Sequence, residues 1–184
     1  MPTPAKTSRT QLIAIARRLV EAGGPDALTV SAVAAKAGVR GPSVYKHFVD
    51  RDELLRAVEI EILAELERTL RAGTEGRSPK QRLRSMADAY RRFAVRRPHR
   101  YAALYSRNAA DDPQLADACR ASAQPLFEEL ERAGLDKARM QPLSRTLTAF
   151  LHGFVSMEIA NAFRLGGDID HDFAESLETI LSTI

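Results

Sequence analysis

Apolar residues recur at three- and four-residue intervals along most of the chain, and no stretch alternates with the two-residue period of a strand. The pattern therefore predicts an all-α protein. We expect two domains, 1–52 with three short helices and 53–184 with a larger helical core. The expected helices beyond the first three cover residues 50–71, 78–97, 98–105, 112–134, 142–165 and 170–184.

Polar residues mark the starts of two N-terminal helices. A capping box at Ser8 is expected to open the first helix. Asp50 is placed as the N-cap of the helix at 50–71, with Glu53 at its third position. Val49 precedes this cap and is expected to pack on Leu54 as a hydrophobic staple.

Prolines and glycines set the boundaries farther along the chain. We expect Pro142 to begin a long apolar helix that Gly166 and Gly167 end, and Asp170 to cap the last helix. Pro125 lies inside the helix predicted at 112–134 and should kink or break it.

Residues 29–48 read as two short helices joined by a tight turn. Thr29 is a good N-cap, and Gly38 tolerates the left-handed conformation that such a turn requires. Gly41 and Pro42 are placed at the N-cap and first position of the second helix. Small and apolar residues then bury the inside of the corner, namely Val33, Ala34, Ala37, Val39 and Val44.

The outward positions of this corner carry cations, hydroxyls and bare backbone, which suit a DNA groove. The pattern predicts a helix-turn-helix, although a plain corner of two helices has the same local signature. Charge favours DNA binding. Residues 1–51 hold eight Lys and Arg against three acids, while the remainder is slightly acidic.

Composition and motifs exclude several other classes of protein. The single cysteine, Cys119, forms no intrachain disulfide, and the chain lacks an apolar run long enough for a membrane span. We expect a cytoplasmic protein with no membrane partner. The four histidines are scattered without metal-ligand spacing, and no phosphate-binding glycine loop or nucleophile motif occurs. We therefore expect no enzyme activity, metal or cofactor.

Gly38-Val-Arg-Gly-Pro-Ser-Val-Tyr-Lys-His-Phe48, followed by Arg51-Asp-Glu-Leu-Leu55, resembles the DNA-binding signature of the TetR family of bacterial transcriptional regulators. The resemblance covers roughly residues 8–60. A His-Gly step at residues 152–153 also resembles the ligand-binding half of one branch of that family. The family often has Ser or Thr where this chain has Arg40 and Gly41, which leaves the operator sequence open.

The DNA-contact residues follow from the residue types and from the resemblance. Arg40 reaches a guanine edge or a phosphate, and Pro42 a thymine methyl, while Gly41 permits close backbone approach. Ser43 bonds a base or a phosphate. Contacts mainly to phosphate are assigned to Thr29, Tyr45, Lys46, His47 and Arg51. For Tyr45 and His47, partial burial in the corner is the alternative, with nearly the same weight.

The last two helices carry more apolar surface than one small domain needs, which indicates a homodimer through a four-helix bundle. The alternative is that both faces simply close the domain. The charged pairs Arg91-Arg92 and Arg96-Arg97 read as a solvated face. His152 is interpreted as a core histidine rather than a ligand contact.

The resemblance implies a small-molecule effector that enters the C-terminal core and changes the separation of the two reading heads. We thus expect a ligand-responsive regulator, most simply a repressor on a palindromic operator. The alternative is a ligand-independent DNA-binding or protein-interaction module. The candidate pocket residues, each also a candidate for plain core, are Met86, Tyr90, Phe93, Tyr101, Leu104, Tyr105, Phe127, Phe150, Phe154 and Met157.

Overall fold

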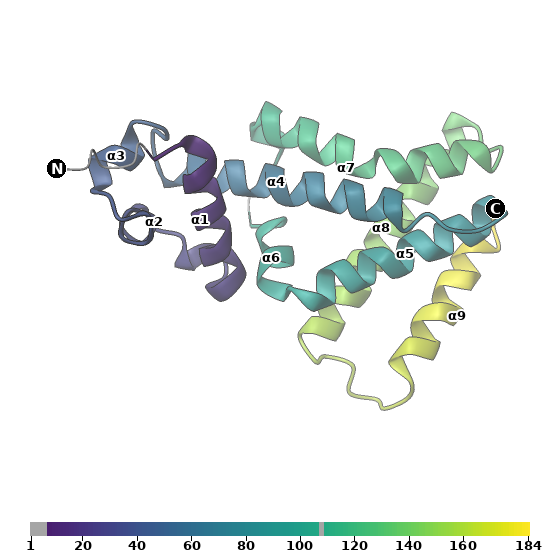
Figure 1. Ribbon diagram of the computed structural model, residues 1–184. Coiled ribbons are helices and arrows are strands. Elements are labelled where there is room, and N and C mark those ends of the chain that lie inside the picture. The colour runs from purple at the N-terminus through teal and green to yellow at the C-terminus, as the bar shows by residue number, and fades with distance from the viewer. Residues whose placement is uncertain (1–6, 107–108) are drawn as a thin grey trace. The chain divides into compact units, whose positions relative to one another are not determined.

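The computed structural model describes residues 7–106 and 109–184, and all regular structure within them is helical (Figure 1). The predicted all-α fold is confirmed. The elements in chain order are α1 (Arg9–Gly23), η1 (Pro25–Ala27), α2 (Val30–Ala37), α3 (Gly41–Tyr45), α4 (Arg51–Ala72), α5 (Pro79–Arg96), α6 (Pro98–Ala103), η2 (Ala109–Asp111), α7 (Pro113–Arg132), α8 (Lys137–Ile159) and α9 (Ile169–Leu181).

The chain forms two compact units. The N-terminal unit comprises the chain up to residue 63 together with residues 97–119, and the C-terminal unit comprises residues 64–96 and 120–184. Helices α4 and α7 each begin in the first unit and end in the second. The predicted division at residues 52 and 53 falls at the start of α4 and stays a prediction.

The N-terminal unit is built around α1. Its capping box is formed as predicted: the hydroxyl of Ser8 accepts from the Gln11 N–H, and the Gln11 side chain accepts from the Ser8 N–H. Leu12, Ala16 and Val20 are fully buried along one side of α1. This side packs against α2 and α6, so α1 supports the helix-turn-helix.

The predicted corner of α2 and α3 is confirmed, with one shift. Gly38 ends α2 in the left-handed region at φ 68°. Arg40, not Gly41, is the N-cap of α3, so Gly41 and Pro42 occupy its first two positions. Arg40 has the extended backbone that is usual for an N-cap residue. Any residue adopts this conformation, so the cap position does not require glycine.

Helix α4 begins at Arg51, and the side chain of Asp50 accepts from the N–H of Glu53 at 2.7 Å. The predicted staple is wrong, because Val49 is 82% exposed. Its backbone N–H donates instead to Glu53 at 2.7 Å, so a polar contact closes this helix start.

In the C-terminal unit, α5 packs against α8 and α9 around a core of buried apolar residues. Phe173 of α9 belongs to this core and is 1% exposed. Its ring stacks on Phe150 at 5.6 Å between centroids and meets Phe154 edge-on at 5.0 Å. The aromatic residues of the last two predicted helices therefore close this core.

Three predicted boundaries in this half are wrong. Helix α8 begins at Lys137 with Asp136 as its cap, and Pro142 lies inside it. It ends at Ile159, because Asn161 adopts a left-handed φ of 51° and the N–H of Ala162 bonds back to Met157. Asp168, rather than Asp170, caps α9 by accepting from two backbone N–H groups.

Helix α7 continues through Pro125, so the chain does not break there. The carboxylate of Asp112 accepts from the N–H of Leu115 at the start of α7. A proline inside a helix forgoes one backbone hydrogen bond.

Candidate DNA-binding site and ligand-binding core

The segment from Arg40 to His47 presents a run of accessible groups beside the buried corner. Arg40, Pro42, Tyr45 and Lys46 are exposed, and Tyr45 is 56% exposed. Gly41, Ser43 and His47 are partly accessible, while Val44 is fully buried and anchors α3. The structure thus brings seven of the predicted DNA contacts onto one short segment.

Thr29 lies at the other end of the corner, at the start of α2. Its exposed hydroxyl accepts from the Ala32 N–H at 3.1 Å and lies 3.1 Å from the hydroxyl of Ser31. The predicted N-cap is confirmed. A capping threonine keeps the N-terminus of α2 in place, and the first backbone N–H groups of the helix point outward from that end.

Arg51 has a structural contact that the sequence did not predict. Its guanidinium donates from Nε to the carbonyl of Leu28 and from one terminal nitrogen to the carbonyl of Pro25, both at 2.7 Å. The other terminal nitrogen pairs with Asp52. Arg51 therefore fastens the connection between α1 and α2 to the start of α4.

A second unpredicted contact joins α1 to the end of the helix-turn-helix. The guanidinium of Arg9 lies 4.5 Å from the centroid of the Phe48 ring, which is almost fully buried. The same guanidinium pairs with Glu53 at 3.2 Å. Arg9 thus links the residue that follows α3 to the first turn of α4, and only the charge of Arg9 was visible in the sequence.

The candidate pocket residues divide between the two units. Tyr101, Leu104 and Tyr105 belong to the N-terminal unit, where the two tyrosine rings lie 5.3 Å apart. The others belong to the C-terminal unit, where Met86, Tyr90 and Phe93 are buried on α5. Phe127, Phe150 and Phe154 are partly buried, and Met157 is 44% exposed.

Arg91 does not belong to a solvated face, which corrects the prediction. Its Nε and one terminal nitrogen bond both carboxylate oxygens of Glu158 at 2.7 and 2.8 Å. The guanidinium also pairs with Asp170 and lies 4.9 Å from the centroid of the Phe173 ring. Hydrogen bonding by Glu158, with a further contribution from Asp170, raises the pKa of Arg91.

His152 on α8 is half-buried, and this desolvation lowers the pKa of its imidazole. Burial has this effect because it disfavours the charged form of the ring. In the part of the chain that the structure describes, no three His, Cys, Asp or Glu side chains gather where they would hold a metal ion. No helix described in this chain combines the length and apolar character needed to cross a membrane.

Two family models match the chain. Residues 12–58 match the bacterial regulatory proteins of the tetR family, and residues 83–181 match the Tetracyclin repressor-like C-terminal domain. An uncharacterised HTH-type transcriptional regulator of Mycobacterium tuberculosis, Rv0681, is 34% identical over 170 residues, covering 92% of this chain and 77% of that protein. The chain belongs to the TetR family. It is a DNA-binding transcriptional regulator, in a family whose members are ligand-responsive.

Solved structures share the fold of this TetR-family chain. A protein of unknown function from Rhodococcus sp. RHA1 has a TM-score of 0.83 at 23% identity and covers 100% of this chain and 99% of its own. A TetR variant from Acinetobacter baumannii AYE in complex with minocycline has a TM-score of 0.70 at 21% identity, with 96% of each chain covered. The two family models and the relative from Mycobacterium tuberculosis confirm the family resemblance seen in the sequence.

Proposed function

We propose that the protein is a homodimeric repressor that binds a palindromic operator and leaves it when a small apolar or amphipathic molecule binds. The observation that carries this proposal is the accessible segment from Arg40 to His47, held on a buried corner inside the region matched by the tetR model. Helix-turn-helix dimers read two half-sites about 34 Å apart, one turn of DNA.

Within this proposal, Arg40 is the principal base-reading residue. It is exposed at the cap of α3, and bidentate contact of arginine with guanine is the commonest specific choice. Lys46 and Tyr45 are assigned to phosphates, which fix the orientation of the protein without reading sequence. Gly41 and Pro42 let the start of α3 approach the bases closely.

The dimer interface is assigned to α8 and α9. Ala149, Gly153 and Met157 are exposed at helical spacing along α8, and exposed Ala160 follows at its C-cap, which makes a narrow apolar stripe of mostly small side chains. No heavy atom of the surrounding protein lies within 4 Å of a Cβ added at Gly153. Small residues permit close approach of a second helix, so the stripe supports self-association across a two-fold axis.

The effector is assigned to the aromatic C-terminal core. A structurally similar protein binds minocycline, and the apolar residues around Phe150 and Phe154 suit an amphipathic molecule of that general kind. Such a ligand lowers operator affinity only if it binds the DNA-incompetent state more tightly than the DNA-bound state.

The experiment that tests the proposal is selection from a library of random duplex DNA at near-physiological salt, followed by sequencing. A palindrome with half-sites one turn apart is expected. Binding that is independent of sequence and steeply dependent on salt would instead contradict a specific repressor.

The competing function is a DNA-binding or protein-interaction module that takes no ligand. A thermal-shift screen of apolar and amphipathic compounds distinguishes the two, because only a ligand-binding protein is stabilised by mass action. Compounds that stabilise the protein should also release the selected operator.

A further inference from the structure

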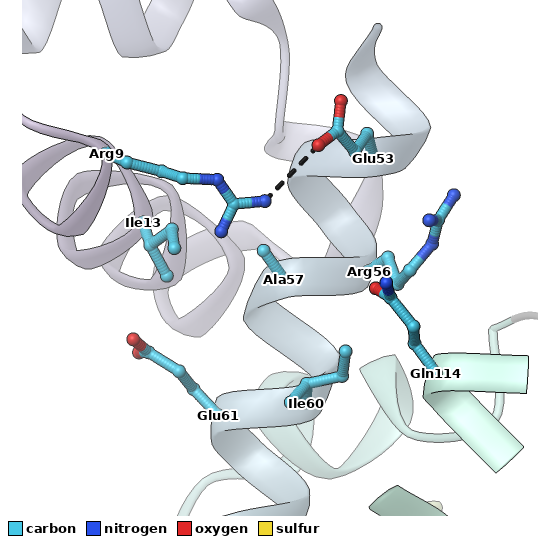
Figure 2. Close-up of a pocket in the computed structure, with 8 residues that line it drawn as sticks. All are labelled: Arg9, Ile13, Glu53, Arg56, Ala57, Ile60, Glu61 and Gln114. Atoms are coloured by element: carbon cyan, nitrogen blue, oxygen red, sulfur yellow. Dashed lines mark hydrogen bonds and ion pairs between the residues drawn. The ribbon is translucent and has the colours of Figure 1, made fainter. Parts of the chain in front are cut away.

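A groove of about 210 Å³ lies within the N-terminal unit, along α4 and beside α1 and the start of α7. Its lining residues include none of those assigned to DNA or to the effector. Figure 2 shows Ala57 and Ile60 along α4, with Arg9, Ile13 and Glu61 to one side of them and Arg56 and Gln114 to the other.

The positive charges of this groove are already neutralised. Arg9 pairs with Glu53 at 3.2 Å, and Arg56 pairs with Asp112 at 2.5 Å. Glu61 has no hydrogen-bond or ion-pair partner among the residues that the structure describes. The groove therefore carries one uncompensated negative charge, and its electrostatics favour a cation.

The other lining residues favour an organic cation over a metal ion. Ile13 and Ala57 are buried and Ile60 is half-buried, so the floor beside the carboxylate is apolar. A hard metal ion needs several oxygen ligands, whereas Glu61 supplies a single unpaired carboxylate. A concave surface with an apolar floor, one carboxylate outside the ion pairs and an amide suits a small organic ligand.

We propose that this groove binds a small amphipathic amine. The ammonium group of the amine pairs with Glu61, and its aromatic or aliphatic body covers Ala57 and Ile60. Gln114 also lines the groove, and its amide can bond a further polar group of the ligand. The site is separate from the effector site in the C-terminal core.

Contacts around the groove lead to the DNA-reading helix. Arg9 stacks on Phe48, and Glu53 accepts from the N–H of Val49, so both residues of this ion pair hold the segment that follows α3. An amine seated between α1 and α4 stabilises the arrangement that supports α3. The effect on DNA rests on the proposed function, whereas binding of the amine does not.

The test uses phenethylamine as the probe, with phenylacetate and 2-phenylethanol as charge controls, and follows binding to the full chain by ligand-observed NMR and thermal shift. Only the amine is expected to bind, with millimolar affinity. Glu61→Gln should weaken it by roughly tenfold, since hydrogen bonds to charged groups contribute about that factor. Glu131→Gln, the same change at an exposed site on α7 outside the groove, should leave it unchanged.

A second variant tests the groove at a residue other than Glu61. Gln114→Arg places an extra cation in the groove from an exposed position and should also weaken phenethylamine binding. Equal affinity of phenethylamine for the folded wild type and for folded Glu61→Gln would overturn the site. Absence of amine binding would also overturn it, as would binding of phenylacetate or 2-phenylethanol as tight as that of the amine. Operator binding measured on the same samples tests the proposed function separately.

Discussion

Arg40 and Arg51 both belong to the predicted DNA contacts, but their guanidinium groups are used differently. Arg40 is exposed at the cap of α3, whereas Arg51 is bonded to two backbone carbonyls. A side chain without a structural task is removable at little cost to stability. Removal of a side chain that holds two segments together lowers stability. Arg40 is therefore tested by DNA binding, and Arg51 by unfolding as well as DNA binding.

Arg40→Ala should remove base preference at one position of each half-site. We expect a loss of about 1–3 kcal/mol in discrimination at that position, with little change in thermal stability. The measurement is fluorescence anisotropy on the selected operator, its single-base variants and random DNA. Lys36→Ala, another exposed cation outside α3, is the control. Equal loss on operator and random DNA for Arg40→Ala would remove the base-reading role.

Arg51→Ala should lower the free energy of unfolding by about 2 kcal/mol, because the carbonyls of Pro25 and Leu28 lose a charged donor. Arg51 is also assigned to a phosphate, so its loss should weaken binding to all DNA sites and flatten the salt dependence. Arg51→Lys separates the two effects, since lysine keeps the charge but does not span both carbonyls. Urea unfolding of the two variants checks this, and an unchanged midpoint for Arg51→Ala would rule out the structural role.

At the scale of helices, sequence predicts an element well when its signal is local. The caps at Ser8, Thr29 and Asp50 depend on neighbours within one turn, and all three form. Pro142 misled the prediction because proline is common at helix starts, yet Asp136 caps the helix upstream.

Long-range contacts escaped the sequence for a different reason. Arg91 is separated from Glu158 by 67 positions, and Arg51 from Leu28 by 23. No periodicity or motif links such pairs, so the sequence predicted the exposed residues of the DNA-binding segment but not the contacts that hold it.

Arg91→Ala should loosen the attachment of α5 to α8 and α9. It leaves Glu158, whose side chain is 18% exposed, without its bidentate partner and removes the cation from the Phe173 ring. We expect a loss of about 2–3 kcal/mol in unfolding free energy, since a partly buried charge is left unpaired. Denaturant unfolding measures it, and Arg92→Ala at an exposed neighbour on α5 should change little. Similar midpoints for the two variants would contradict this account.

For the whole molecule, charge and apolar surface are segregated along the chain. The excess of cations lies in residues 1–51, where the DNA-binding segment is, while the exposed apolar stripe lies on α8. Cations in the reading region attract DNA, and an apolar stripe elsewhere favours a second copy of the chain. The proposed DNA-binding and dimerisation surfaces therefore lie on different segments of the chain, and each can be altered without touching the other.

Gly153→Arg should separate the proposed dimer into folded monomers. No heavy atom of the surrounding protein lies within 4 Å of an added Cβ, so one chain accommodates the new side chain, whereas a closely packed second α8 does not. A buried unpaired charge costs about 3 kcal/mol or more, which raises the dimer dissociation constant by roughly a hundredfold.

Sedimentation velocity reports the mass directly, and circular dichroism checks that the Gly153→Arg variant is folded. Thr148→Arg introduces the same side chain at an exposed position on another side of α8 and should remain dimeric. The monomeric variant should bind a single half-site weakly and lose the palindrome preference, since two linked half-sites bind far more tightly than one. A wild-type mass for Gly153→Arg would place the interface elsewhere than on the α8 stripe.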